Sequence, residues 1–257
     1  MLLAIDIGNT NIVLGLYSGE KLLHKFRLET VKNKTAEDYA IDIVELFLSS
    51  KVDCLKITHV AIASVVPLLN EVIEKAVQKF YHGEILTVGK NLKLNVEIDL
   101  KNKQEVGQDR LLNAIAGYKK FGGNLIIIDF GTATTFDVVG SKGEYLGGII
   151  APGVNLSVKA LHDMTAQLPK IQIKAPKNVI GKSTVEAMNS GIYFGYISLV
   201  EGLVAKIKNE LGISSIQVII TGGLAPLFGD ALTSKDHICE DLTIEGLRLS
   251  LLNNKYV

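Results

Sequence analysis

The hydrophobic residues of this chain fall into short apolar runs that alternate with segments of helical periodicity. The runs Leu2–Ile5, Val60–Val66 and Leu125–Ile128 are typical of buried strands, because nearly every position in them is apolar. Thr35-Ala36-Glu37-Asp38 has the pattern of a capping box and predicts a helix that continues through Phe47. Strands that alternate with helices in this way predict an α/β fold.

The same periodicity predicts further elements in both halves of the chain. After Pro67, apolar residues recur on one face of a helix. The further predicted elements are a strand at 22–28, a helix with Val72, Ile73, Ala76, Val77 and Phe80 on its apolar face, a helix at 109–121 and a strand at 217–220.

A short turn sequence occurs twice, as Ile-Asp-Ile-Gly-Asn-Thr at 5–10 and as Ile-Asp-Phe-Gly-Thr-Ala-Thr at 128–134. Each copy follows an apolar run and precedes a second β-rich stretch, so each predicts a strand, a tight turn and a strand. A chain of 257 residues can form two domains of ordinary size. The repeat therefore predicts two similar domains, which we place at 1–118 and 119–257.

Both copies of the turn carry residues suited to binding phosphate. An Asp at a strand end can hold a metal ion or orient a phosphate, and the following Gly lets backbone N–H groups approach an anion closely. Two such turns facing each other across a cleft would clamp a nucleoside triphosphate. The alternative is that each is a hairpin whose Asp and Asn only satisfy the turn backbone. The candidates are Asp6, Gly8, Asn9, Thr10 and Asn11 in the first copy, and Asp129 as a cation ligand with the hydroxyls of Thr132, Thr134 and Thr135 in the second.

Three other motifs bear on chemistry. Gly107-Gln108-Asp109-Arg110 places a carboxylate beside a guanidinium, as a general base next to an anion-binding group would be, but a capped helix start with a solvated Arg has the same pattern. Thr221-Gly222-Gly223 follows a strand, and its glycines would let a base or ribose lie against the backbone. Gly181-Lys182-Ser183-Thr184 is similar to the end of a P-loop, but Pro176 stands where that motif requires Gly, so we reject a P-loop.

Composition excludes several classes of protein. The formal net charge is +0, which provides no overall attraction to nucleic acid or to an anionic membrane. No apolar run reaches the roughly 18 to 20 residues that span a bilayer. The two cysteines, Cys54 and Cys239, have no metal-ligand spacing and indicate reduced, buried thiols, so we expect a cytoplasmic protein.

Taken together, these motifs resemble those of the type III pantothenate kinases, which belong to the actin-like superfamily with acetate kinases, sugar kinases and actin. The resemblance runs nearly end to end, and its specificity lies in the order and spacing of the motifs. The residues that carry it are Asp6–Thr10, Val106–Arg110, Asp129–Thr134, Gly147–Gly153, Gly181–Thr184 and Thr221–Gly223.

The resemblance implies a fold and an activity. The fold would be two ribonuclease H-like halves with a nucleotide cleft between them. The protein would be a transferase that uses ATP to phosphorylate pantothenate to 4′-phosphopantothenate, the first step of coenzyme A biosynthesis. The resemblance also implies Mg²⁺, a monovalent cation (K⁺ or NH₄⁺), a homodimer and a place in the cytoplasm.

The resemblance further implies roles for individual residues. Asp109 would be the catalytic base, Asp129 the ligand of the monovalent cation, and Asp6 a ligand of Mg²⁺. The ATP phosphates would bind Asp6, Ile7, Gly8, Asn9, Thr10, Asn11, Ile12, Val13 and Thr132. Pantothenate would bind Gly107, Gln108, Asp109, Arg110 and Thr184. Thr184 lies far from the phosphate turns in sequence and is the residue we expect near a dimer interface.

The chain departs from the family pattern at three positions. Family members often carry Tyr and Pro seven and four residues before the motif glycine, where this chain has Leu100 and Lys103, and an Ala where it has Gln108. Loss of the Tyr removes a potential wall or hydrogen bond for pantothenate, so the departures bear on substrate affinity more than on chemistry.

Two other functions remain open from sequence. One is a different small-molecule kinase or a phosphohydrolase of the same superfamily, which would share the two Asp turns without needing the motif around Asp109. The other is a nucleotide-binding regulatory protein of the same fold without kinase turnover. Retention of Asp6, Asp109 and Asp129 argues against the regulatory protein.

Overall fold

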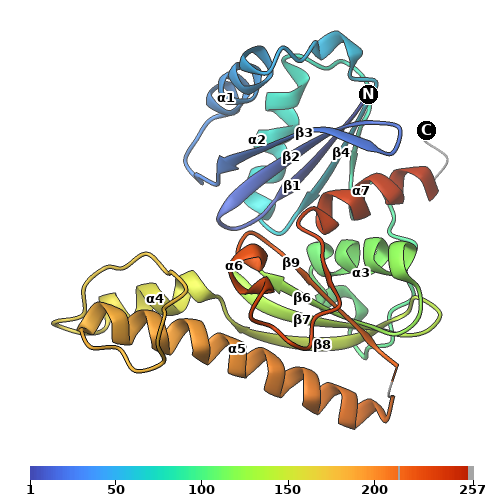
Figure 1. Cartoon of the computed structure of the whole chain (residues 1–257). Helices are drawn as coiled ribbons and strands as arrows, with labels where there is room; N and C mark the ends of the chain where they lie inside the picture. Colours follow the sequence, from blue (N-terminus) through green and yellow to red (C-terminus); the bar gives the residue numbers. More distant parts are fainter. Residues whose placement is uncertain (214, 254–257) are drawn as a thin grey trace. The chain divides into compact units, whose positions relative to one another are not determined.

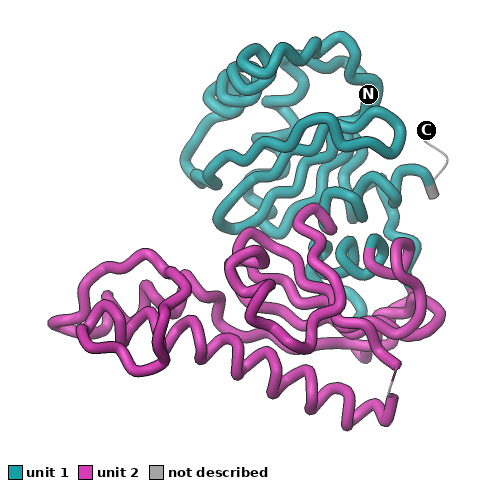
Figure 2. Tube along the Cα trace, viewed as in Figure 1, with its two compact units in different colours: residues 1–96, 102–116, 243–257 teal, residues 97–101, 117–242 magenta. Residues whose placement is uncertain are grey.

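The computed structural model describes residues 1–213 and 215–253 of the chain. These residues form two compact units (Figure 2). Unit 1 contains residues 1–96 and 102–116 and the C-terminal segment that begins at Thr243, and unit 2 contains residues 97–101 and 117–242. Each unit is built around its own five-stranded sheet.

Unit 1 has the strand order β3-β2-β1-β4-β5. The first three strands form an antiparallel meander, while β4 and β5 run parallel to β1. The strands are β1 (Leu2–Ile7), β2 (Asn11–Ser18), β3 (Lys21–Glu29), β4 (His59–Ser64) and β5 (Ile85–Thr87). The helices are α1 (Ala36–Ser49), η1 (Cys54–Lys56), α2 (Pro67–Gln78), η2 (Lys103–Glu105), α3 (Gln108–Phe121), whose last turn belongs to unit 2, and α7 (Leu242–Asn253).

Helices cover both faces of the central strand of unit 1. Side chains alternate across a strand, so Leu3, Ile5 and Ile7 pack with α1 and α2 on one face, while Leu2 and Ala4 pack with α3 and α7 on the other. This burial on both faces explains why β1 is a continuous apolar run rather than an alternating pattern.

Unit 2 repeats this plan with the strand order β10-β9-β6-β7-β8. Here β6, β7 and β8 form the antiparallel meander, and β9 and β10 run parallel to β6. The strands are β6 (Leu125–Phe130), β7 (Ala133–Val139), β8 (Tyr145–Pro152), β9 (Gln217–Thr221) and β10 (His237–Ile238). The helices are α4 (Val154–Asp163), α5 (Thr184–Leu211) and α6 (Ala225–Gly229), which cover one face of the sheet (Figure 1).

The two sheets therefore have the same connectivity, with β6 in the place of β1, and the predicted pair of similar α/β halves is confirmed. The helix that the capping box predicts is also present, because Thr35 and Asp38 cap each other at the start of α1. The compact units differ from the predicted division into 1–118 and 119–257. Residues 97–101 associate with unit 2, and α7 packs its apolar side chains into unit 1.

Two smaller expectations can be compared with the structure. Cys54 and Cys239 are free thiols, as predicted, but each is only partly buried. Among the described residues, no helix is both long enough and apolar enough to cross a membrane.

Candidate functional site

The first candidate phosphate turn connects β1 to β2 in unit 1. The two strands stay paired as far as Ile7 and Ile12, and the Gly8 N–H donates a hydrogen bond to the carbonyl of Asn11 at 3.0 Å. Asn9 and Thr10 are exposed at the tip of the turn. The turn therefore presents polar groups and backbone to solvent, as a site for an anion must.

Asp6 lies one residue before the end of β1. It is flanked by Val13 on β2 and by Ala63 on β4, so its backbone is held from both sides by the sheet. Its side chain is partly buried. A carboxylate in this position is carried by a strand that is paired on both sides, and it is still partly accessible to solvent.

The candidate base Asp109 lies in the first turn of α3. The carbonyl of Gly107 accepts hydrogen bonds from Arg110 N and Leu111 N at 3.2 and 3.3 Å, so the helix begins there. Asp109 Oδ1 accepts a hydrogen bond from Arg110 N at 2.9 Å. Burial raises the pKa of the Asp109 carboxyl above its ordinary value, and the N–H and guanidinium of Arg110 act in the opposite direction.

Gly107 leaves room for this carboxylate. A methyl group on Gly107 would lie 2.5 Å from Asp109 Oδ1, which is closer than two such atoms can approach. The motif glycine therefore lets the Asp109 carboxylate keep this position, and a larger residue would displace it.

Gln108, where the chain departs from the family pattern, joins the end of β4 to the residue that follows β5. Its Oε1 accepts a hydrogen bond from Ser64 N at 3.2 Å, and its Nε2 donates to the carbonyl of Val88 at 3.1 Å. Ser64 pairs with Ile7, and both are the last residues of their strands. The start of α3 is therefore tied to the carboxyl ends of β1 and β4, where Asp6 and its turn lie. Unit 1 thus brings the Asp6 turn and the Asp109 motif to the same end of its parallel strands. The predicted contact of Gln108 with substrate remains a prediction.

The second candidate turn, in unit 2, connects β6 to β7. Asp129 pairs with Thr135 on β7 and with Thr221 on β9, and the Gly131 N–H donates to the carbonyl of Ala133 at 3.1 Å. Thr132 is exposed at the tip, and its carbonyl would lie 2.0 Å from a methyl group on Gly153. The start of α4 therefore packs directly on the turn.

Gly222 has a role that its motif did not predict. Its φ is +91°, and a methyl group there would lie 2.3 Å from Asp129 Oδ1 and 2.7 Å from Phe130 N. The Thr221-Gly222-Gly223 motif thus makes room for the Asp129 carboxylate. The predicted contact of these glycines with a base or ribose remains a prediction.

Sequence reasoning missed a buried polar group on the same sheet. Asp137 is fully buried, and it accepts hydrogen bonds from the hydroxyls of Tyr145 at 2.9 Å and Thr135 at 3.3 Å. The signal was a carboxylate inside the apolar stretch Phe136–Val139. Such a residue must find donors, because an unpaired buried charge is costly.

Thr184 is the first residue of α5 in unit 2 and is exposed. Ser183 caps the helix through Glu186 N at 3.3 Å, and Glu186 accepts in turn from Lys182 N at 2.6 Å. No strand lies between Pro152 and Thr184, all of which the structure describes, so the rejection of a P-loop is confirmed. The segment is instead the capped start of a helix.

The fold is similar to that of two solved kinase structures. The chain matches the structure of a Sinorhizobium meliloti protein proposed to be a 2-dehydro-3-deoxygalactonokinase. The match covers 100% of each chain, with a TM-score of 0.63 and 12% sequence identity. A glucokinase from Streptomyces griseus matches over 97% of each chain with a TM-score of 0.51 and 13% identity. At these identities the likeness concerns the fold alone, which is that of the actin-like ATPases and sugar kinases.

Sequence comparison then gives the family. A sequence model of the type III pantothenate kinases matches residues 2–206. The chain is 45% identical over 255 residues to the type III pantothenate kinase of Geotalea daltonii, with 99% of each chain covered. It is 44% identical to that of an Exiguobacterium species, over 99% of this chain and 100% of the relative. The chain belongs to the type III pantothenate kinase family.

Proposed function

We propose that this protein transfers the γ-phosphoryl group of ATP to the primary hydroxyl of pantothenate, forming 4′-phosphopantothenate and ADP for coenzyme A biosynthesis. The observation that carries the proposal is the family match over residues 2–206, which spans every candidate site residue from Asp6 to Thr184. The actin-like kinase fold of the chain supports it.

In this mechanism Asp109 is the general base. Its carboxylate takes the proton of the pantothenate hydroxyl while that oxygen attacks the γ-phosphorus, and the bond from phosphorus to the leaving oxygen of ADP breaks. Arg110 is assigned to the carboxylate of pantothenate, because a guanidinium recognises that group through two parallel hydrogen bonds. Gly107, Gln108 and Thr184 complete the proposed pantothenate site.

The two glycine turns are assigned to the ATP phosphates. The residues from Asp6 to Val13 form one phosphate site and Thr132 belongs to the other. Backbone N–H groups in such turns stabilise charge on the transferring group without reorganising during the reaction.

We assign the cations that the resemblance implies to single carboxylates rather than to a cluster of protein ligands. Among residues 1–213 and 215–253, no cluster of three or more His, Cys, Asp or Glu side chains could hold a metal ion. Mg²⁺ in kinases is typically held by one or two carboxylates together with substrate phosphates, a role that Asp6 can fill, and Asp129 is assigned to K⁺ or NH₄⁺. When bound, these cations would neutralise charge on the phosphates.

Purified protein supplied with ATP, Mg²⁺ and K⁺, with and without pantothenate, tests the proposal. We expect ADP release that depends on pantothenate and a product with the mass of 4′-phosphopantothenate, and we expect turnover to fall when Na⁺ replaces K⁺. Turnover with other small alcohols but not pantothenate would contradict the substrate. No turnover in a folded protein that binds ATP would favour the regulatory alternative.

We further propose that the protein is a cytoplasmic homodimer that associates through unit 2. Residues 164–183 form no helix or strand, and they lie beside α4 and the start of α5 (Figure 1, yellow to orange). Exposed apolar side chains that gather in one segment are typical of a protein interface. Those of this segment and its neighbours are Ile150, Leu156, Met164, Val179, Ile180 and Val185.

Light scattering during gel filtration tests the oligomeric state. We expect twice the chain mass of 27.8 kDa for the wild type and a shift toward the monomer when Ile180 and Val185 are both replaced by Asp. A matched control replaces the exposed Leu48 and Leu55 of unit 1, and the dimer should persist. A wild-type mass of one chain at micromolar concentration would contradict the dimer.

A further inference from the structure

The segment between β3 and α1 contacts the first phosphate turn. Thr30, the first residue after β3, donates its backbone N–H to the carbonyl of Thr10 at 2.9 Å. Its hydroxyl Oγ1 donates to the carbonyl of Gly8 at 2.7 Å. Thr30 thus binds the turn on both sides of the exposed residue Asn9, although it lies 22 residues from Gly8 in sequence.

The residue after Thr30 is anchored to a buried side chain of α1. The Tyr39 hydroxyl accepts a hydrogen bond from Val31 N at 2.8 Å and donates to the carbonyl of Val31 at 2.9 Å. The Tyr39 side chain is fully buried, so this hydroxyl is a fixed point. Val31 is therefore held at both of its backbone polar groups, and this constrains the neighbouring Thr30.

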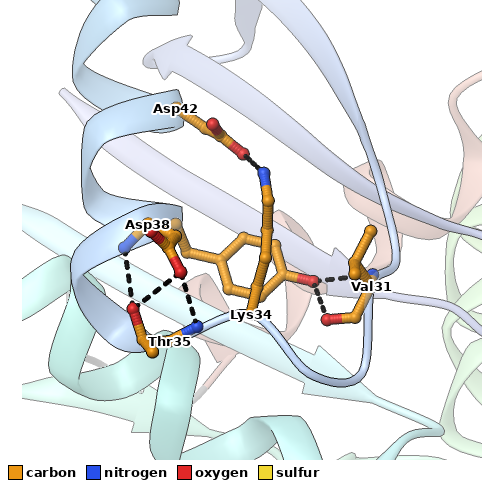
Figure 3. Close-up of polar contacts among 6 residues, drawn as sticks. Val31, Lys34, Thr35, Asp38 and Asp42 are labelled. Atoms are coloured by element: carbon orange, nitrogen blue, oxygen red, sulfur yellow. Dashed lines mark hydrogen bonds and ion pairs between the residues drawn. The ribbon is translucent and has the colours of Figure 1, made fainter.

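Further contacts order the same segment against α1 (Figure 3). Lys34 forms an ion pair with Asp42, and its ammonium lies 5.5 Å from the centroid of the Tyr39 ring. Thr35 and Asp38 form the capping box at the helix start, with Thr35 N donating to Asp38 at 3.0 Å. The segment 30–35 is thus a fixed link between the first turn of α1 and the phosphate turn, rather than a loose connection.

The phosphate turn needs such a link. The tip of the turn is exposed. The hydrogen bond from Gly8 N to the carbonyl of Asn11 joins two residues of the turn to each other, so it does not anchor the turn to the rest of unit 1. A turn that must present N–H groups to a phosphate binds it more tightly when it is ordered in advance, because less conformational freedom is lost on binding.

We propose that Thr30 is a positioning residue that holds the turn from Gly8 to Asn11 in its phosphate-binding conformation, with Tyr39 as its support. The inference rests on the proposed function in one respect, namely that this turn binds the phosphates of a nucleotide. It assigns no contact with the substrate to Thr30 itself.

The test replaces Thr30 by Val, which keeps the branched shape and the backbone N–H and removes only the hydroxyl donor. A net hydrogen bond of this kind corresponds to roughly a 3- to 10-fold change in an equilibrium constant. We expect the Kd and KM for ATP to rise by that factor, with the KM for pantothenate and the melting temperature nearly unchanged. Thr30→Ser, which restores a hydroxyl, should return the ATP affinity to within about twofold of wild type.

Thr58→Val is the matched control. The Thr58 hydroxyl also donates to a backbone carbonyl, that of Met1, at 3.2 Å. Met1 precedes β1, so this hydrogen bond lies at the opposite end of β1 from the turn. Loss of the Thr58 hydroxyl should leave ATP affinity unchanged.

Tyr39→Phe removes the hydroxyl that holds Val31 and leaves Thr30 itself intact. This variant should also raise the Kd for ATP.

The binding measurement separates this inference from the proposed function. Titration of the protein with ATP and Mg²⁺ by calorimetry needs no turnover, so it reports on the turn even if pantothenate is not the substrate. Hydrogen exchange of the Gly8 amide supplies a second readout and should be faster in Thr30→Val than in Thr30→Ser. Wild-type ATP affinity and wild-type exchange in Thr30→Val would overturn the inference, and equal weakening by Thr58→Val would also overturn it.

Discussion

Replacement of Asp109 by Asn is expected to lower kcat by about 10²- to 10⁴-fold, because an amide cannot accept the proton of the substrate hydroxyl. The Asn side chain keeps the size of Asp, and its oxygen can still accept the hydrogen bond from Arg110 N. The fold and the KM for ATP should therefore change little. Steady-state kinetics together with a thermal melt measure both effects. A kcat close to that of wild type would remove Asp109 from the role of base.

The pH dependence of the wild type provides an independent check of the same role. Burial raises the pKa of the Asp109 carboxyl above its ordinary value. Because a general base must be ionised, kcat/KM should be lost as the pH falls through this raised pKa and should be regained above it. The residual activity of Asp109→Asn should lack this acidic limb.

Gly107→Ala tests the position of the carboxylate rather than its chemistry. The new methyl group would lie 2.5 Å from Asp109 Oδ1, and the flexible end of a side chain can move away at little cost to folding. We expect a marked loss of kcat with a nearly unchanged free energy of unfolding. Gly195→Ala is the control, because Gly195 lies in α5 with open space around it.

Replacement of Gly222 by Ala is expected to have the largest effect on stability. A side chain at the φ of +91° costs about 1–2 kcal/mol, and a methyl group 2.7 Å from Phe130 N adds roughly 1–3 kcal/mol of steric strain. The free energy of unfolding should thus fall by about 2–5 kcal/mol. Because the same methyl group would lie 2.3 Å from Asp129 Oδ1, activity should fall as well. Denaturant unfolding and kinetics at saturating ATP measure the two effects.

Gly212→Ala separates the two causes. Gly212 ends α5 with a φ of +63°, but no atom lies within 4 Å of the position of a new methyl group. Replacing Gly212 should lower the free energy of unfolding by only about 1–2 kcal/mol, which is the cost of a side chain at a positive φ, and should leave activity unchanged. Equal destabilisation by the two substitutions would show that the steric contacts of a methyl group on Gly222 with Asp129 and Phe130 contribute nothing to the loss of stability.

The elements that the sequence predicted are those that depend on neighbouring residues. The two Asp turns lie between paired strands, the capping box of Thr35 starts α1, and α3 occupies the predicted residues with one added at its start. Hairpin turns and helix caps are local, because the groups that satisfy each backbone N–H lie within a few residues.

The contacts that sequence reasoning missed join residues far apart in the chain. Gln108 binds Ser64 across 44 residues, and Thr30 binds Gly8 across 22. The C-terminal helix α7 joins unit 1, although its sequence neighbours belong to unit 2. No local pattern specifies these partners, because an amide, a hydroxyl or an apolar helix can bind many surfaces and the choice depends on which surface the folded chain brings near.

The sequence by itself thus determined the strand–turn–strand repeat, the α/β class and the residue types of the candidate site. Only the tertiary structure decided how that site is supported: Gln108 ties the start of α3 to Ser64, Gly222 leaves space for Asp129, and Thr30 ties down the first turn. The physical reason is that chemistry depends on residue type, which a sequence states directly. Positioning depends on steric exclusion and on hydrogen bonds between distant segments, which exist only once the chain has folded.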